Sequence, residues 1–209
     1  MTTTKEEMIE RHIRARRVRD EHVLRAMEEV ERTHFVPEDL REYSYADKPL
    51  PIGGEQTISQ PYIVAYMVEA LGVGPGDKVL EIGSGCGYNA AVLSRIADHV
   101  YSIEIIASLA DLARSNLDAA GIENVTVRHG DGFGGWSEEA PFDAVMLTAA
   151  PSEIPEPLKQ QLKIGGRLLA PVGAGSQQLM LIEKTGGDEY RERPLIPVRF
   201  VPMTGEADG

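Results

Sequence analysis

Three acidic side chains in this sequence lie at the ends of short apolar runs, where carboxylates could bind hydroxyl and amino groups of a ligand. Glu81 precedes the glycine-rich stretch Gly83–Gly87, Glu104 closes the next apolar run, and Asp131 follows the third. Glycines between a strand and a helix let the backbone approach a bound nucleotide. At the end of a second strand, Glu104 could accept both hydroxyl protons of a ribose, and Asp131 could accept a hydrogen bond from an adenine amino group.

The spacing of the glycines separates one class of adenosine cofactor from another. A dinucleotide-binding loop has Gly or Ala three residues after its second glycine, where this chain has Tyr88. An acid, one residue and then Gly-x-Gly-x-Gly instead resembles the first motif of S-adenosyl-L-methionine-dependent methyltransferases. Each acid alone is compatible with turn formation or a solvated surface, but three in order favour cofactor binding. The predicted cofactor-binding residues in this part of the chain are Glu81, Gly83, Ser84, Gly85, Glu104, Asp131 and Gly132.

The chain around these residues alternates apolar runs with helical stretches. The predicted strands are 78–82, 100–103, 125–129, 142–148 and 166–172, and the predicted helices are 90–97, 108–119 and about 154–162. Strands alternating with helices predict an α/β fold with a doubly wound, mostly parallel, Rossmann-like sheet. Beyond it, 178–183 and 190–201 resemble a hairpin, which predicts antiparallel C-terminal strands at one edge.

We expect one compact unit with two parts. Residues 1–75 would form an N-terminal helical and loop region that carries a substrate-site segment, and 76–209 an α/β domain with a C-terminal β extension that binds the cofactor. Residues 5–36 lack Gly and Pro, and their apolar positions predict one or two amphipathic helices. The arginines of this region could form an anion site, but acids interleave with them, which favours an ion-paired, solvated face; they are Arg11, Arg14, Arg16, Arg17 and Arg19. Residues 33–54 are expected to be an ordered loop, followed by a helix over 63–71.

Composition restricts the partners. The chain has 209 residues, 42% hydrophobic and 26% charged, which is typical of a soluble globular protein. Its net charge of −12 disfavours a nucleic-acid partner held by phosphate contacts. A lone cysteine, Cys86, and the lack of a signal peptide or long apolar run predict a cytoplasmic protein without a membrane partner. We also expect a monomer, and no metal because the five histidines lack metal-ligand spacing.

The end of the fourth strand bears on the methyl acceptor. Amino-group methylases of nucleic acids have an Asn/Asp-Pro-Pro-aromatic motif there, whereas residues 147–151 read LTAAP. Pyrimidine-carbon methylases need a cysteine nucleophile in a Pro-Cys context. Cys86 instead lies in the glycine loop, where we expect a packing role, so both of these acceptors are disfavoured.

The stretch PIGGEQTISQPYIVA at 51–65 is the most informative part of the sequence. Together with 81–88, GDGFGGW at 130–136, APFDAVMLTAA at 140–150, LKIGGRLLAPVG at 162–173 and VRFVPMT at 198–204, it closely resembles the protein-L-isoaspartate O-methyltransferase family. The resemblance runs from about residue 19 to 204. Its most specific part is Thr57–Pro61, which generic methyltransferases lack.

This resemblance implies an enzyme that transfers a methyl group from S-adenosyl-L-methionine to the free α-carboxylate of L-isoaspartyl residues in damaged proteins and peptides. The ester would initiate repair through a succinimide. Ser59 is implied as the active-site residue, Thr57 and Ile58 as cofactor-binding residues beside it, and Thr204 as a substrate contact. A substrate carboxylate with a pKa of about 4 needs no general base. Ser59 would therefore orient it by a hydrogen bond; the alternative is that Ser59 caps the following helix.

Two other functions stay open: a methyltransferase for a small carboxylic acid or RNA, and a non-catalytic adenosine-binding module. The family run at 57–61 favours the isoaspartyl enzyme. The sequence departs from the family pattern at two places. Gly54-Glu55 before that run leaves the charge at the cleft entrance open, and Ile105 after Glu104 leaves the contacts beside the adenine open. Phe133 and Trp136 are expected to pack a loop, and a substrate-lining role is the alternative. The net charge of −12 requires a locally neutral or basic cleft for a carboxylate substrate, or binding through peptide backbone contacts.

Overall fold

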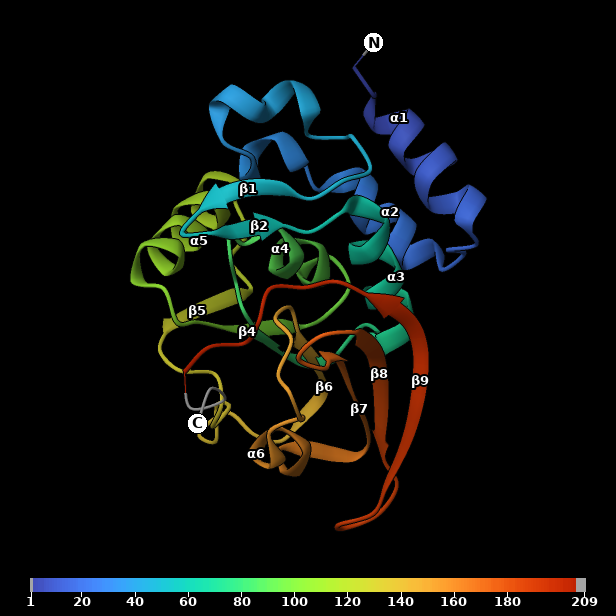
Figure 1. The fold of residues 1–209 in the computed structure, drawn as a ribbon, viewed down its shortest axis with the longest axis vertical. Coiled ribbons are helices and arrows are strands. Elements are labelled where there is room, and N and C mark those ends of the chain that lie inside the picture. The colour runs from blue at the N-terminus through green and yellow to red at the C-terminus, as the bar shows by residue number, and fades with distance from the viewer. Residues whose placement is uncertain (1, 206–209) are drawn as a thin grey trace.

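The computed structural model describes residues 2–205, and a seven-stranded sheet forms its centre (Figure 1). The strands are β3 Lys78–Ile82, β4 His99–Glu104, β5 Val125–His129, β6 Phe142–Leu147, β7 Leu162–Val172, β8 Gln177–Lys184 and β9 Tyr190–Val198. Their order is β5-β4-β3-β6-β7-β8-β9, with parallel pairing from β5 to β7 and antiparallel pairing of β8 and β9. The predicted sheet and its antiparallel edge are confirmed.

Helices cover both faces of this sheet, more heavily on one side. They are α3 Pro61–Leu71, α4 Tyr88–Ser94, α5 Ala107–Ala119 and α6 Glu156–Gln160. Successive strand side chains point to opposite faces. Val79 of β3 therefore lies in the larger core with α3, α4 and the N-terminal region, whereas Leu80 lies in a smaller core with Leu158 of α6. Phe133 and Trp136 pack against this smaller core, as predicted.

The N-terminal region is helical, and a break decides between the one or two helices that the sequence predicted. Its elements are α1 Lys5–Glu7, a π-helical turn Met8–Ile13, a 3-10 turn Arg14–Arg16 and α2 Glu21–Glu29. Arg17 interrupts the helix with a φ of 73°. Arg11 pairs with Glu7 at 3.1 Å and Arg14 with Glu10 at 3.2 Å, so the predicted ion-paired face is confirmed for these arginines.

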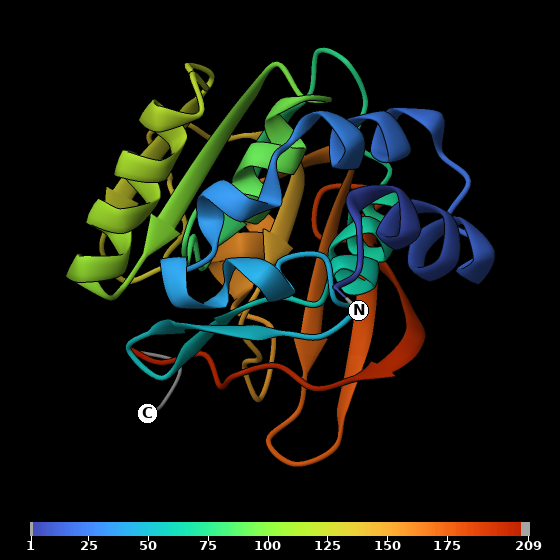
Figure 2. The same ribbon diagram turned by 90° about the horizontal axis from the view of Figure 1, so that it is seen from above.

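Residues 33–54 contain more regular structure than the predicted loop. Two 3-10 turns, Arg32–Phe35 and Glu38–Tyr43, precede strand β1 Leu50–Gly53, which pairs antiparallel with β2 Gln56–Ile58. Pro51 made this strand hard to predict, but a strand with one unpaired edge tolerates proline. In Figures 1 and 2 the hairpin, in cyan, lies beside the red segment that follows β9. Strand β2 therefore carries Thr57 and Ile58, and residues 59–60 connect it to α3.

Candidate active site

The candidate active site is a cleft of about 1080 Å³ at the carboxyl ends of the parallel strands. The β3–α4 loop and the ends of β4 and β6 line it, together with residues 56–64 and 196–204. Strand order reverses between β3 and β6, which is where open α/β sheets bind their ligands. Ligand clefts usually have volumes of about 300–1,000 Å³, so this one has room for a cofactor and part of a second substrate.

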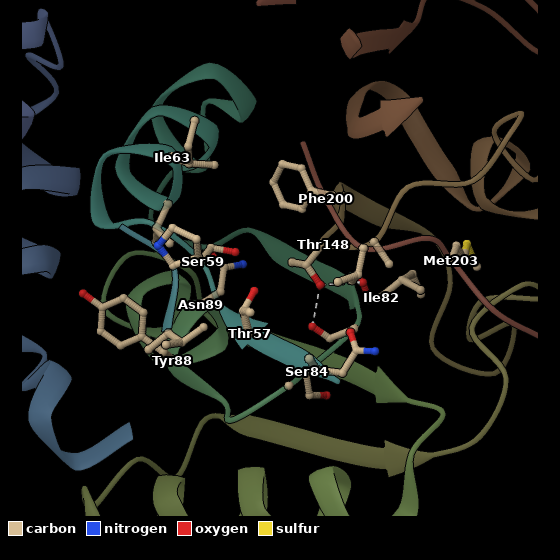
Figure 3. A pocket seen from close by; sticks show the side chains of 18 of the residues that line it. Thr57, Ser59, Ile63, Ile82, Ser84, Tyr88, Asn89, Thr148, Phe200 and Met203 are labelled. Carbon is tan, nitrogen blue, oxygen red and sulfur yellow. Dashed lines mark hydrogen bonds between the residues drawn. The ribbon is translucent and has the colours of Figure 1, made fainter. Parts of the chain in front are cut away.

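The β3–α4 loop is held against the end of β6. Gly83 has a φ of 101°, and a Cβ there would collide with the Thr148 hydroxyl. That hydroxyl donates a hydrogen bond to the Gly83 carbonyl at 2.6 Å, and the Thr148 N–H donates to the Ile82 carbonyl at 3.0 Å (Figure 3). Glycine at position 83 is thus required both by the backbone conformation and by the close approach of β6.

Glu104 joins the glycine loop to the end of β4. It is buried and lines the cleft. Its Oε2 accepts a hydrogen bond from the Gly85 N–H at 2.8 Å, and its Oε1 accepts one from the Ile106 N–H at 3.0 Å. A carboxylate has about four acceptor positions, so two remain for ligand hydroxyl groups. The geometry therefore fits the predicted ribose contact.

The third acid is placed differently. Asp131 is exposed, and its Oδ1 accepts a hydrogen bond from the Phe133 N–H at 2.8 Å. The neighbouring Gly132 is buried and lines the cleft, whereas Asp131 is not among the described residues that line it. A side chain on Gly132 would collide with Ile82. An adenine ring would therefore meet Gly132 first, and the predicted Asp131 contact would have to come from the edge of the cleft.

Glu81 lies behind the cleft wall, and the prediction of a direct cofactor contact needs correction. It is fully buried, accepts hydrogen bonds from Ser102 Oγ and, at 2.8 Å, from Asn89 Nδ2, and is not among the described lining residues. Ser102 Oγ is in turn 2.5 Å from Ser84 Oγ. Because Asn89 and Ser84 do line the cleft, Glu81 can act on a ligand through them. Burial raises the pKa of Glu81 to about 7.

The segment Thr57–Ser59 forms the opposite wall, where the side chains of Thr57 and Ser59 point into the same cleft as Thr148 (Figure 3). Gln60, not Ser59, is the N-cap of α3, and it makes no side-chain cap bond. The alternative role of Ser59 as a helix cap is therefore wrong. Thr57, Ile58 and Ser59 all line the cleft together with Ser84, as the sequence-based assignment requires.

Asp47 anchors this wall from behind. Its Oδ2 accepts hydrogen bonds from Gln60 Nε2 at 2.8 Å and from Arg16 Nη1 at 3.1 Å, and its Oδ1 accepts one from the Tyr62 N–H at 3.2 Å. The Arg16 guanidinium also stacks on the Tyr62 ring, with its Cζ 3.3 Å from the ring centroid. The residues that flank Ser59 are therefore fixed, and Arg16 reaches the cleft, which its place in a charged helix did not reveal.

The segment 199–204, which follows β9, closes the remaining side. The Gln177 side chain holds it: Nε2 donates to the Phe200 carbonyl at 3.0 Å, and Oε1 accepts from the Phe200 N–H at 2.6 Å. Ala150 binds the same segment through two backbone hydrogen bonds of 2.8 Å, with Val201 and Met203. Thr204, the predicted substrate contact, lines the cleft in this segment, with Phe200 and Met203 beside it.

Sequence reasoning did not identify several residues of the site. They are Arg16, Asn89, Thr148, Gln177, Phe200 and Met203. Phe200 and Met203 lie in the VRFVPMT run that carried part of the family resemblance, so a signal was present for them. No sequence signal indicated Gln177, because its hydrogen-bond partner Phe200 is distant in the sequence. Cys86, predicted to be a packing residue, is buried, and burial raises the pKa of its thiol to about 11.

Comparison with known proteins identifies the family of this chain. The family model of protein-L-isoaspartate(D-aspartate) O-methyltransferase (PCMT) matches residues 3–208. The chain belongs to the PCMT family. It is 50% identical over 205 residues to the protein-L-isoaspartate O-methyltransferase of Picosynechococcus sp., covering 98% of this chain and 92% of that protein. It is 51% identical to the enzyme of the same name from Methanothermobacter thermautotrophicus, covering 90% and 89%.

Solved structures of PCMT relatives share the fold over nearly the whole chain. One protein-L-isoaspartate O-methyltransferase superimposes with a TM-score of 0.87 at 32% identity, covering 98% of this chain and 67% of that one. A Plasmodium falciparum protein assigned to the same enzyme class superimposes with a TM-score of 0.85 at 25% identity, covering 98% and 99%. The latter was crystallised with S-adenosyl-L-homocysteine, the demethylated form of the cofactor.

Two further features describe residues 2–205 of this PCMT-family chain. Each of its helices there is too short or too polar to cross a membrane. In the same part of the chain, no three His, Cys, Asp or Glu side chains come together in a way that could hold a metal ion.

Proposed function

We propose that this chain transfers the methyl group of S-adenosyl-L-methionine to the free α-carboxylate of L-isoaspartyl residues in damaged proteins and peptides, which starts their repair through a succinimide. One observation carries the proposal: a single cleft joins the glycine loop and Glu104 to Ser59 and the segment 199–204. The first pair suits an adenosine cofactor, and the second suits a peptide. Full-length relatives at about half identity carry the corresponding enzyme name, which supports it.

The proposed cofactor contacts follow the geometry of the cleft. The loop residues Gly83, Ser84 and Gly85 would face the methionine part, Glu104 the ribose, and Gly132 the adenine, with Asp131 at its edge. Thr57 and Ile58 would contact the cofactor from the other side. The two free acceptor positions of Glu104 support the ribose contact, since its other two are used by the Gly85 and Ile106 N–H groups.

Methyl transfer to this carboxylate would require little from the protein beyond orienting the two reactants. When bound, S-adenosyl-L-methionine would supply a methyl group on a cationic sulfur. A carboxylate oxygen would bond to the methyl carbon, and the electron pair of the broken carbon–sulfur bond would stay on sulfur. An isoaspartyl α-carboxylate, with a pKa of about 4, is ionised at neutral pH and therefore loses no proton in this step. Ser59 would donate a hydrogen bond to one carboxylate oxygen and so direct the other. Because the reaction neutralises two opposite charges, a cleft that excludes water favours it.

The test is a methylation assay with paired peptides. The chain is incubated with methyl-labelled S-adenosyl-L-methionine and with peptides that differ only in an aspartyl or isoaspartyl linkage. Base-labile methyl ester is then measured, and we expect it only on the isoaspartyl peptide. A small dicarboxylic acid and an RNA transcript serve as parallel substrates. Equal labelling of both peptides, no labelling, or preferential labelling of the acid or the RNA would overturn the proposal.

The organisation and cellular context are also proposed. Residues 1–75 would contribute the substrate side and 76–209 the cofactor side of one compact unit, supported by a core that joins buried residues of both parts. A cytoplasmic monomer without nucleic-acid or membrane partners is consistent with the net charge of −12. Within residues 2–205, the exposed large hydrophobic side chains are Tyr43 and Ile164, which leaves no extended apolar patch for a stable dimer. Light scattering coupled to gel filtration tests the monomer.

A further inference from the structure

A fully buried cation lies directly behind the proposed catalytic serine. Arg32, in the 3-10 turn before Val36, has no exposed surface. Its Nη2 donates a hydrogen bond to the Ser59 carbonyl at 2.7 Å, and its Nε donates one to the Ser44 carbonyl at 2.7 Å. Its Nη1 is buried without a hydrogen-bond partner. Both of its hydrogen-bond acceptors are neutral carbonyl groups, so neither supplies a counter-charge.

Burying such a charge is costly, and the surroundings of Arg32 offset the cost only in part. Removing an ion from water is strongly unfavourable unless another charge compensates it. Burial lowers the pKa of Arg32, while Tyr88, Cys86 and, more weakly, the Asp47 carboxylate act in the opposite direction. The guanidinium Cζ lies 4.7 Å from the centroid of the Tyr88 ring, within the range of a cation–π contact. Arginine nevertheless stays protonated in proteins, so the wall beside Ser59 carries a positive potential that an anion in the cleft would complement.

The other charged groups near this wall are compensated or solvated. Arg16 lines the cleft, but its Nη1 is 3.1 Å from Asp47 Oδ2. The Asp47 carboxylate in turn binds the side chain of Gln60 and the N–H of Tyr62. Arg199 also lines the cleft, but it is exposed, so water and salt screen its charge. Among the described residues, Arg32 is therefore the cation at this wall that is both enclosed and without a direct ion pair; the Asp47 carboxylate, already paired with Arg16, favours its charge only from a distance.

We infer that Arg32 is a positioning residue for Ser59 and makes the cleft select a carboxylate over a neutral group of the same shape. This inference rests on the proposed function. Its hydrogen bond fixes the Ser59 backbone, so that the Ser59 side chain faces the cleft. Its charge acts on the substrate carboxylate through dry protein, without direct contact. The same arrangement explains how a chain with a net charge of −12 can bind an anionic substrate.

The experiment compares binding of two peptides to the enzyme saturated with S-adenosyl-L-homocysteine. One peptide contains an L-isoaspartyl residue, and the other contains the isoasparaginyl residue, whose α-carboxamide is neutral and nearly isosteric. Calorimetry gives the ratio of the two Kd values. We expect the wild-type chain to prefer the carboxylate by about tenfold or more, from one buried charge without a direct ion pair in a low-dielectric wall. Arg32→Met should reduce this preference to about twofold or less.

Arg32→Lys is the rescue variant, because it keeps the charge but loses the guanidinium geometry that donates to the Ser44 and Ser59 carbonyls together. It should retain most of the carboxylate preference while lowering kcat through a less well fixed Ser59. Arg114→Met is the matched control, since the Arg114 side chain also donates to a backbone carbonyl, that of Val127 at 3.2 Å, and Arg114 is not among the described cleft residues. Its Kd ratio should equal that of the wild-type chain.

The dependence of the Kd ratio on salt concentration tests the inference without a variant. Raising NaCl from about 0.05 to about 0.5 M should change the wild-type Kd ratio less than about threefold, because buried charges are weakly screened. Collapse of the ratio with salt would assign selection to the exposed arginines and overturn the inference. An unchanged ratio in folded Arg32→Met would also overturn it. A wild-type chain that methylates no isoaspartyl peptide refutes the proposed function instead, so the two failures are distinguishable.

Discussion

Replacing Glu81 by glutamine should change how the stability of this protein depends on pH. Glu81 is fully buried between Ser102 and Asn89, whose hydrogen bonds favour its charged form. Desolvation by burial outweighs these bonds, and the nearby Glu104 acts in the same direction as burial, so the pKa of Glu81 rises from 4.5 to about 7. The folded protein therefore binds this proton more tightly than the unfolded chain does.

The sign and size of the effect follow from linkage. Between pH 4.5 and about 7, the unfolded chain has lost this proton while the folded protein keeps it, so the unfolding free energy falls as pH rises. The stabilisation is fully present below pH 4.5 and is lost above about pH 7. At about 1.4 kcal/mol per pH unit, the whole change is about 3 kcal/mol. Glutamine does not titrate, so Glu81→Gln should gain about 2–3 kcal/mol relative to wild type between about pH 5 and pH 8.

Urea unfolding of both proteins across this pH range measures the difference. Any fixed cost of changing the hydrogen bonds to Ser102 and Asn89 is independent of pH and cancels when values at two pH values are subtracted. Glu153→Gln, at an exposed position, makes the same change in net charge and corrects for it. A difference between wild type and Glu81→Gln that stays constant within about 0.5 kcal/mol from pH 5 to pH 8 would refute the reasoning.

Three further substitutions test the cleft. Ser59→Ala should lower kcat/KM for an isoaspartyl peptide by roughly tenfold to a hundredfold, since a hydrogen bond to a charged group contributes about 1.5–3 kcal/mol; calorimetry should show unchanged cofactor affinity, and full activity would contradict the role. Glu104→Gln should weaken cofactor binding by about tenfold or more through loss of charge-assisted hydrogen bonds, and an unchanged Kd would exclude the ribose contact. Gln177→Met should raise the peptide KM by about tenfold, because two hydrogen bonds that hold Phe200 are lost; a KM equal to that of wild type would show that segment 199–204 is held without Gln177.

The features that could be predicted from sequence depend on neighbours along the chain. Apolar runs that end in glycine or an acid predicted the parallel strands, because a buried strand needs a continuous apolar segment. Pro61 at the first turn and Gly72 in a left-handed conformation bound α3 at the places where their backbone preferences fit. Since parallel strands present their carboxyl ends at one edge, the glycine loop and Glu104 could also be expected to meet.

The features that could not be predicted depend on segments that are distant in sequence. Pro51 concealed the hairpin that carries Thr57, and its pairing across a turn with positive φ values appears only in the folded chain. An arginine in a charged N-terminal region gives no sign that it will be buried, yet Arg32 is buried because it satisfies carbonyl groups 12 and 27 residues away. Gln177 likewise binds a backbone 23 residues away.

The sequence by itself therefore determined the sheet, the cofactor side of the cleft and the family, because local patterns and a family-specific run specify them. Only the tertiary structure decided which acids face the cleft and which lie behind it. Burial is a property of all surrounding segments together, so it separates Glu104, which lines the cleft, from Glu81, which is enclosed and has a raised pKa. The same reason applies to Arg32, because its charge can select a carboxylate only after folding has enclosed it away from water.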